Sequence, residues 1–207
     1  MKRIIIQLLN WLSKKRLSKK VCCIGDQTIL YYTAKISLTQ KATKENIKLS
    51  NNSRVYGSLV SCGKGKIIMG EYAALGAKSA IKAVNSIEIG AYTAIAPNVI
   101  IQDNNTHPVN PNDRLKMRIT PSGHISRSWL YSDSAPIKIG KNCWIGENSR
   151  ICKGVTIGDG SIVAANSVVT HDVPENSIAA GNPAKIVKTD IHLNSKEYFK
   201  KWPELEF

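Results

Sequence analysis

The chain has 207 residues, which is enough for one domain with a hydrophobic core. Apolar residues make up 43% of it and charged residues 21%, ordinary values for a globular protein that exclude wholesale disorder. The net charge is +14, but the surplus lies mainly in residues 1–48, so it does not indicate a nucleic-acid-binding surface on the folded body. The five cysteines are an odd number without CxxC spacing, which excludes a regular disulfide framework and favours a reducing, cytoplasmic location.

Residues 1–20 predict an amphipathic helix. Its apolar stripe consists of Ile4, Ile5, Leu8, Leu9 and Leu12, and five cations follow at Lys14, Lys15, Arg16, Lys19 and Lys20. The apolar part is too short to span a bilayer, and no small-residue cleavage site follows it, so we expect neither a membrane span nor a secretory signal. Two interpretations stay open. The stripe packs on the body or on a neighbouring subunit, or the helix lies on an anionic membrane as a peripheral contact.

A six-residue repeat dominates the second half of the chain. From Ile139 the hexads read IGKNCW, IGENSR, ICKGVT, IGDGSI, VAANSV and VTHDVP. A period of six fits neither an α-helix nor a simple strand. It fits a flat strand followed by a tight turn. Three such units close one triangular turn of about eighteen residues, with glycines at corners of positive φ. The same pattern, with slippage, is present upstream from Met69.

The sequence therefore predicts an all-β fold, a parallel β-helix over residues 51–188. A basic helix and a lead-in segment occupy 1–50, and a short helical tail occupies 189–207. The repeat is interrupted by a loop over 102–136. Such an excursion has a closure entropy that grows only slowly with its length, and long loops on rigid scaffolds commonly carry binding and catalysis.

Three motifs give the chain a family resemblance: W-I-G at 144–146, G-V-T-I-G-D at 154–159 and A-G-N-P-A-K at 180–185. Residues 55–188 resemble the hexapeptide-repeat acyltransferases, and within them the maltose and galactoside O-acetyltransferase branch with its relatives in polysaccharide biosynthesis. The resemblance implies a left-handed coil, against the usual right-handed crossover rule. It also implies acetyl-CoA as co-substrate and a homotrimer whose active sites lie between neighbouring coils.

The resemblance also implies that His107, at the interruption, is the catalytic base. A free sugar hydroxyl is a weak nucleophile at neutral pH, and a histidine with a pKa near neutrality can remove its proton. His124, in the same loop, is the second candidate. Asp103, Asn104 and Asn105 precede His107 and either orient its ring and bind the acceptor or are plain turn residues.

On the donor side, the resemblance places Trp144 at the active site, although an outward tryptophan could equally fill a subunit interface. It places backbone groups near Glu147 and Ala165 against the pantetheine arm of coenzyme A. The positions that match contacts to the coenzyme phosphates are Thr170, His171, Lys185 and Lys188.

The function expected from these features is transfer of an acetyl group from acetyl-CoA to a sugar hydroxyl, in capsule, O-antigen or exopolysaccharide synthesis. An N-acetyltransferase acting on a nucleotide-linked amino sugar is the alternative, and a non-catalytic β-helix scaffold is a weaker one. A zinc lyase would need three converging histidines, which the spacing of the four histidines does not favour, so we expect no metal. Cys143 and Cys152 suggest an alternative mechanism through a covalent acyl-cysteine. We favour direct transfer from the coenzyme to the acceptor, because neither cysteine has an activating base as a neighbour in sequence.

Overall fold

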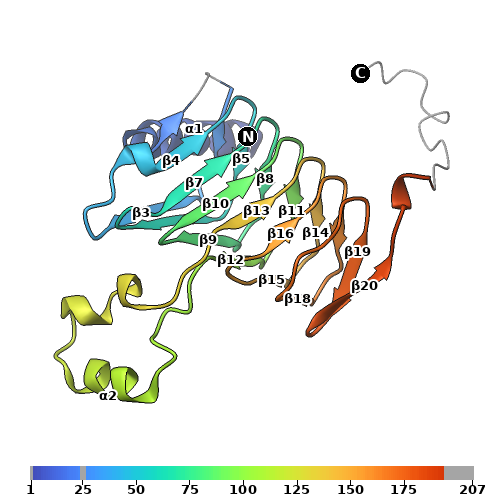
Figure 1. Ribbon diagram of the computed structural model, residues 1–207. Helices are drawn as coiled ribbons and strands as arrows, with labels where there is room; N and C mark the ends of the chain where they lie inside the picture. Colours follow the sequence, from blue (N-terminus) through green and yellow to red (C-terminus); the bar gives the residue numbers. More distant parts are fainter. Residues whose placement is uncertain (1, 24–26, 194–207) are drawn as a thin grey trace, which may run out of the picture.

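Hexads with an inward aliphatic residue form short parallel strands, and the chain winds these strands into a three-sided coil. The computed structural model describes residues 2–23 and 27–193 (Figure 1). We name its three sheets face A, face B and face C, because the chain visits them in that order in each turn of the coil. The predicted parallel β-helix with few helices is confirmed, while its left-handed sense stays a prediction.

Face A consists of β1 (Cys22–Cys23), β4 (Ile47–Leu49), β7 (Lys66–Met69), β10 (Ser86–Ile89), β13 (Ile137–Ile139) and β16 (Thr156–Ile157). Face B consists of β2 (Ile29–Leu30), β5 (Arg54–Val55), β8 (Ala74–Leu75), β11 (Ala94–Ile95), β14 (Trp144–Ile145), β17 (Ile162–Val163), β19 (Ile178–Gly181) and β20 (Ala184–Lys188). Face C consists of β3 (Lys35–Thr39), β6 (Ser58–Cys62), β9 (Ala80–Ala83), β12 (Ile100–Gln102), β15 (Arg150–Ile151) and β18 (Val168–Val169). All pairings are parallel except that of β19 with β20.

The core is a set of stacked aliphatic columns inside the coil. On face A, the pairing register places Ile67, Ile87 and Ile137 above one another, and all three are buried. Paired residues are 20 positions apart from Ile67 to Ile87 but 18 apart from Ile139 to Ile157. The longer upstream turns explain why the six-residue period slips there.

Asparagines, more than glycines, occupy the corners at which the backbone takes a positive φ. The corner between faces A and B carries Asn52, Tyr72, Tyr92, Asn142, Gly160 and Asn176 at such angles, and the corner between B and C carries Lys78, Asn98, Asn148 and Asn166. Asparagine tolerates this region better than most residues. Gly146 serves a different purpose, since a Cβ there would lie 2.5 Å from the backbone nitrogen of Ala165 in the next turn. The expectation that glycines take the positive-φ corners was therefore wrong at most corners.

The N-terminal helix α1 (Lys2–Leu17), continued by η1 (Ser18–Lys20), packs at the N-terminal end of the coil. Leu17 joins the core, the Ser13 hydroxyl donates to the Tyr31 carbonyl at 2.9 Å, and the Tyr32 N–H donates to Asn10 Oδ1 at 3.0 Å. These residues are not the predicted apolar stripe, whose members are exposed. The interpretation that the stripe packs on the chain's own body was wrong. Within the described segments, no helix is long and apolar enough to cross a membrane.

The interruption forms a lobe that hangs from the corner between faces C and A (Figure 1). Ile87 pairs with Ile137, 50 positions later instead of 20, so the excursion adds 30 residues to one turn. It contains α2 (Pro111–Ile119), η3 (Ile125–Arg127) and η4 (Trp129–Tyr131). The remaining short helices are η2 (Lys44–Asn46) and η5 (Ile191–Leu193), and the predicted helical tail beyond 193 lies outside the described residues.

Replacing Ile139 by Ala should lower the free energy of unfolding by about 2–5 kcal/mol, because its buried side chain stacks between Ile89 and Ile157 and leaves a cavity when truncated. The neighbouring Lys138→Ala variant, whose side chain faces solvent on the same strand, should stay within about 0.5 kcal/mol of the wild type. Urea unfolding of the two variants measures the difference. Equal effects would show that inward stacking does not carry the stability.

Candidate functional site

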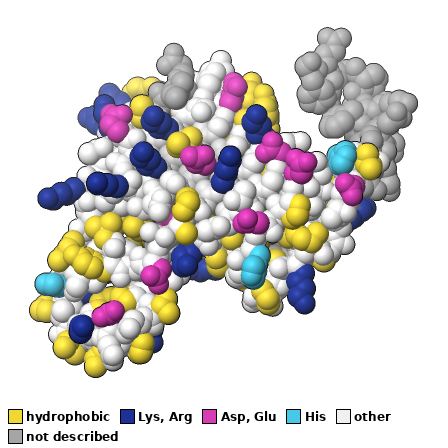
Figure 2. Space-filling model, in the orientation of Figure 1, with side chains coloured by type: hydrophobic (Ala, Val, Ile, Leu, Met, Phe, Trp, Pro, Cys, Tyr) yellow, Lys and Arg dark blue, Asp and Glu magenta, His cyan; other side chains and the backbone are white. Residues whose placement is uncertain are grey.

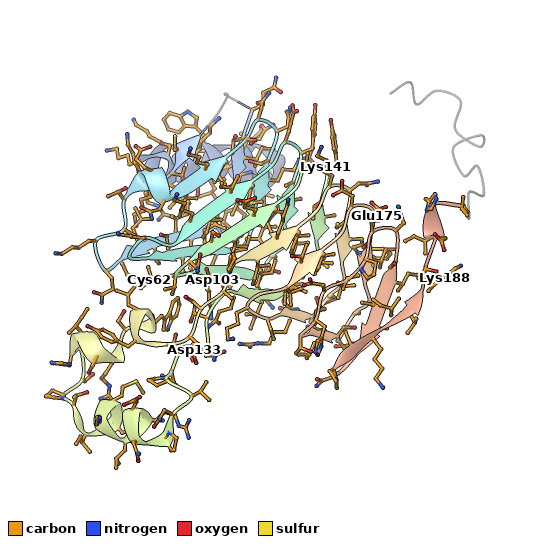
Figure 3. All side chains as sticks on the ribbon, viewed as in Figure 1. Cys62, Asp103, Asp133, Lys141, Glu175 and Lys188 are labelled. Carbon is orange, nitrogen blue, oxygen red and sulfur yellow. The ribbon has the colours of Figure 1, made fainter. Side chains whose placement is uncertain are left out.

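The base of the lobe is held by a buried aspartate. Asp103 directly follows β12, and its carboxylate accepts hydrogen bonds from the backbone N–H of Val84 (2.9 Å) and of Asn85 (2.8 Å) in the preceding turn (Figure 3). The Asn104 side-chain amide donates to the same carboxylate at 3.1 Å. Burial raises the pKa of Asp103 above its usual value, while these three donors act in the opposite direction. Asp103 thus anchors the loop to the coil.

Asn104 shapes the turn that presents His107. Its side-chain oxygen accepts from the Thr106 N–H at 3.0 Å and from the Gln102 amide at 3.1 Å. Thr106 takes a positive φ of 62°, which turns the chain outward immediately before His107. His107 is exposed, so its ring is accessible to a substrate. The buried Asp103 and Asn104 therefore position the backbone that carries His107, and of the three predicted acceptor contacts only Asn105 is exposed.

The returning leg of the lobe packs on face C. The Lys82 ammonium lies 5.8 Å from the centre of the Trp129 ring, and Ser128 Oγ lies 3.7 Å from Cys62 Sγ. Close to Asp103, the Ala135 N–H donates to the Asp103 carbonyl at 3.0 Å. The lobe is therefore fixed to the coil at its base and along one leg. Figure 3 labels Cys62, Asp103 and Asp133 in this region.

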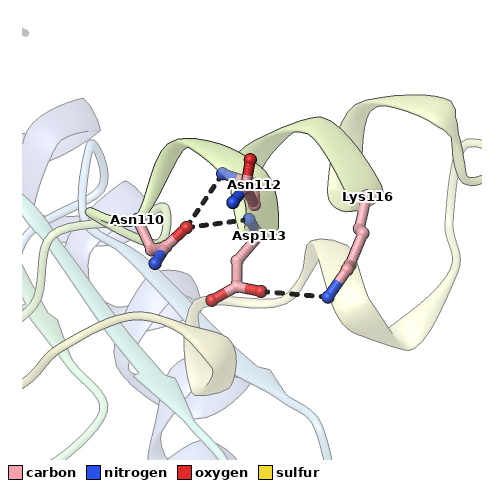
Figure 4. Close-up of polar contacts among 4 residues, drawn as sticks. All are labelled: Asn110, Asn112, Asp113 and Lys116. Carbon is pink, nitrogen blue, oxygen red and sulfur yellow. Dashed lines mark hydrogen bonds and ion pairs between the residues drawn. The ribbon is translucent and has the colours of Figure 1, made fainter.

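Within the lobe, a cavity of about 360 Å³ lies beside α2. The cavity is lined by Pro108, Asp113, Lys116, Met117, Thr120, His124, Ser126 and Tyr131. Helix α2 begins at a good N-cap, because the Asn110 side chain accepts from the N–H groups of Asn112 and Asp113 (Figure 4). Asp113 and Lys116 form an exposed ion pair at 3.5 Å on the same helix. His107 is next in sequence to this cavity but does not line it, whereas His124 does.

The hydrogen bonding of His124 argues against its role as a base. Its Nδ1 accepts from the Ser126 backbone N–H at 3.2 Å and lies 2.8 Å from Ser126 Oγ. A ring that accepts at Nδ1 carries its proton on Nε2 in the neutral form, so Nε2 is then a donor and cannot remove a proton. Among the described contacts, His107 has no such constraint. Of the two histidines in the lobe, only His124 thus has its Nδ1 engaged among the described contacts.

The predicted donor residues lie in two places. Glu147 and Ala165 follow β14 and β17 at the same corner between faces B and C, in successive turns, and the Asn166 N–H donates to the Glu147 carbonyl at 2.8 Å. The Gly181 N–H donates to Ser167 Oγ at 3.1 Å, which places the hairpin carrying Lys185 and Lys188 next to this edge. We call the corner formed by Glu147 and Ala165 in successive turns the B/C edge.

The other predicted donor residues are elsewhere on the coil. Thr170 and His171 follow β18 at the corner between faces C and A, the corner from which the lobe leaves, with Thr170 Oγ1 3.0 Å from His171 Nδ1. Trp144 lies on face B and is 57% exposed. In a three-sided coil, face B is opposite the corner between C and A. The structure therefore does not bring Trp144 and His107 of one chain together.

Cys143 and Cys152, the two cysteines considered for an acyl-cysteine route, lack the surroundings of an activated nucleophile in the described residues. The Cys143 thiol is buried and lies 3.1 Å from the Gly158 carbonyl, and burial raises its pKa, so it stays protonated. Cys152 is partly buried at the corner near the lobe, and within the described residues no basic side chain forms a hydrogen bond with it. In residues 2–23 and 27–193, no three His, Cys, Asp or Glu side chains cluster as a metal site.

Two anchoring features were missed by sequence reasoning. The sequence predicts that Asp103 orients His107, binds the acceptor or forms a turn, whereas its carboxylate holds the loop, and the sequence does not predict that Trp129 packs on Lys82. The position of Asp103, two residues after the last inward aliphatic residue, Ile101, where the hexad pattern is interrupted, was the available signal. Nothing in the sequence indicated Trp129.

Comparisons with known proteins agree with this architecture. Residues 136–171 match the profile described as the hexapeptide repeat of succinyl-transferase. A putative lipopolysaccharide biosynthesis O-acetyl transferase of Escherichia coli, WbbJ, is 35% identical over 63% of this chain and 64% of its own length. The galactoside O-acetyltransferase of Escherichia coli is 38% identical over 56% of this chain and 50% of its own length. Part of the chain thus carries a hexapeptide repeat, and the chain is similar over part of its length to these two O-acetyltransferases.

The match spans less than two thirds of the length of either protein. Among solved structures, AntD, an N-acyltransferase from Bacillus cereus in complex with a dTDP-linked amino sugar and coenzyme A, superposes with a TM-score of 0.64. That likeness covers 91% of this chain and 97% of AntD at 22% identity. At this identity it supports the fold alone.

Replacing Asp103 by Ala should lower the free energy of unfolding by about 1–3 kcal/mol, because the Val84 and Asn85 N–H groups lose their acceptor. Hydrogen exchange at those two amides should accelerate. Asp133→Ala is the matched control, since the Asp133 side chain forms only a long exposed contact (3.4 Å) with Asn105 on the same loop, and its carbonyl, which accepts from the Asn105 N–H, is kept in the variant. If both variants behave alike, Asp103 does not anchor the lobe.

Proposed function

We propose that the chain is an acetyl-CoA-dependent O-acetyltransferase that acts on a sugar hydroxyl in the cytoplasm, in the synthesis of a capsule, O-antigen or exopolysaccharide. The observation that carries the proposal is the exposed His107 on an anchored turn at the interruption of a hexapeptide-repeat coil. The similarity to two E. coli O-acetyltransferases supports the reaction class. The WbbJ relative, by its description, supports a role in polysaccharide synthesis.

The proposed chemistry is a direct transfer. His107 removes the proton of the acceptor hydroxyl as its oxygen attacks the acetyl carbonyl carbon. A tetrahedral intermediate forms, the carbon–sulfur bond breaks, and coenzyme A leaves as a thiol after taking a proton. The protonated His107 is the natural source of that proton.

The B/C edge fits the coenzyme. In the described part of the chain, the N–H groups of Glu147 and Ala165 donate no hydrogen bond, so they are free to bind an extended amide chain such as pantetheine. Lys185 and Lys188 are exposed on the adjoining hairpin and supply cations for phosphates. Thr170 and His171 lie on a different corner, so their proposed contact with the phosphates needs a coenzyme bound near the lobe of the same chain.

His107 and the proposed coenzyme-binding edge lie on different corners of the coil, which supports a site shared between subunits. His107 leaves from the corner between faces C and A, whereas Glu147 and Ala165 lie on the B/C edge. Face C lies between these two edges of one coil. A neighbouring coil in a homotrimer can bring its B/C edge to the lobe, and closed cyclic symmetry is the common form of soluble homo-oligomers. The exposed apolar side chains of the lobe, among them Val109, Leu115 and Ile119, supply surface for such a contact.

N-acylation of a nucleotide-linked amino sugar is the second candidate. The observation behind it is that the AntD fold is covered almost completely by this chain. The general-base chemistry at His107 would be the same for an amine as for a hydroxyl. The acceptor panel below therefore includes both kinds of acceptor.

Replacing His107 by Ala should lower turnover by about 10²–10⁴-fold, while the affinity for acetyl-CoA and the folding stability stay near the wild-type values. The measurement is release of free coenzyme A in the presence of a panel of oligosaccharides and nucleotide-linked amino sugars. His124→Ala is the control and should retain most of the activity, because its Nδ1 is engaged by Ser126. Loss of activity in the His124 variant alone would refute the assignment.

Mixing two inactive variants should restore activity if the site is shared. His107→Ala removes the base, and Ala165→Trp blocks the B/C edge at an exposed position. In trimers assembled at random from equal amounts, about a quarter of the interfaces combine an intact base with an intact edge, so about a quarter of the wild-type activity should return. A site contained within one chain gives no recovery, and light scattering that finds a monomer under active conditions excludes the shared site.

A further inference from the structure

Helix α1 presents its apolar side to solvent. Ile4 is 70% exposed, Leu8 57% and Trp11 58%. The side of the helix that contacts the coil carries Asn10, Ser13 and Leu17. At 100° per residue these two sets lie on opposite sides of the helix. Folding of the chain therefore leaves the apolar stripe uncovered.

The same outward side becomes basic toward the C-terminal end of the helix. Lys15 and Lys19 continue the direction of Leu8, and the Lys15 ammonium lies 5.4 Å from the centre of the Trp11 ring. Residues 1–20 contain seven Lys or Arg residues and no Asp or Glu. An apolar stripe with tryptophan and a cluster of lysines is the pattern of helices that lie in the headgroup region of a membrane.

We propose that the outer face of α1 and of the adjoining η1, formed by Ile4, Leu8, Trp11, Leu12, Lys15 and Lys19, binds the surface of an anionic membrane. The helix lies along the surface, since no described helix is long and apolar enough to cross the bilayer. The apolar side chains enter the boundary between headgroups and acyl chains, and the lysines meet lipid phosphates and carboxylates.

The charge balance favours a membrane over a second copy of the chain. Residues 1–48 hold nine surplus positive charges, and the other 159 residues hold a surplus of five. Neither segment of a second copy therefore offers a net negative charge to the lysines of the helix. An anionic lipid surface supplies that charge. Because α1 packs along β2 of face B, while the lobe leaves from the opposite corner, a chain bound in this way holds the lobe away from the bilayer.

Point variants test this inference better than deletion of the helix, because Leu17 is part of the core and Ser13 bonds to Tyr31. The probe is co-sedimentation of the full chain with vesicles of phosphatidylcholine alone or with about one third phosphatidylglycerol. Lys15→Gln/Lys19→Gln should weaken binding to the anionic vesicles by about 30-fold at low salt, since each cation near such a surface contributes about fivefold. Wild-type binding should also weaken as salt rises.

The matched control is Lys48→Gln/Lys138→Gln, which removes two exposed charges from face A and should bind as the wild type does. Leu8→Gln/Trp11→Gln should abolish binding without changing the melting temperature or the oligomeric mass. Three results would each overturn the proposal: no binding of the wild type to anionic vesicles, equal loss in the two lysine variants, or a smaller oligomeric mass for Leu8→Gln/Trp11→Gln. The last result would show that a second copy covers the helix.

Discussion

The structure depends on keeping the inward aliphatic side chains in register along the three faces of the coil. Its strands have only two to five residues, so none is stable alone, and each is held by the strands of the turns above and below. Buried columns such as Ile67, Ile87 and Ile137 gain many small dispersion contacts only while the turns stay aligned. Any excursion from the coil must therefore return to the same register. This requirement gives the interruption its fixed base.

The lobe satisfies that requirement with hydrogen bonds rather than with apolar packing. Asp103 joins the outgoing chain to the preceding turn, and the Ala135 N–H joins the returning chain to the Asp103 carbonyl. The Gly154 N–H then donates to the Ala135 carbonyl from the following turn. Three consecutive turns are tied together where the regular ladder is interrupted. His107 can therefore stand six residues after the core residue Ile101 on a short, anchored turn. The distal part of the lobe carries exposed hydrophobic side chains (Figure 2).

The sequence was most informative where the structure repeats. Six hexads from Ile139 predicted the coil because inward residues must recur at every strand, and the position of the interruption followed from the same rule. Sequence could not show which side of α1 meets the body, since Asn10 and Ser13 bond to backbone groups of Tyr32 and Tyr31 that are distant in sequence. The role of Asp103 was hidden for the same reason, because its partners are N–H groups of another turn. The corners misled because asparagine and tyrosine can also adopt a positive φ.

The ends of the coil differ in a way that bears on self-association. A stack of parallel strands has an open edge at each end, and two such edges can pair to build a fibre. At the far end of face B, β20 runs antiparallel to β19 and carries Lys185 and Lys188, so the last edge has the wrong direction and charge to continue a parallel ladder. At the other end, the Lys20 ammonium donates to the Ile36 carbonyl of β3 and α1 lies along β2. At β20, β2 and β3, the described edges of the coil are thereby altered or covered against the same edge pairing that holds its interior together.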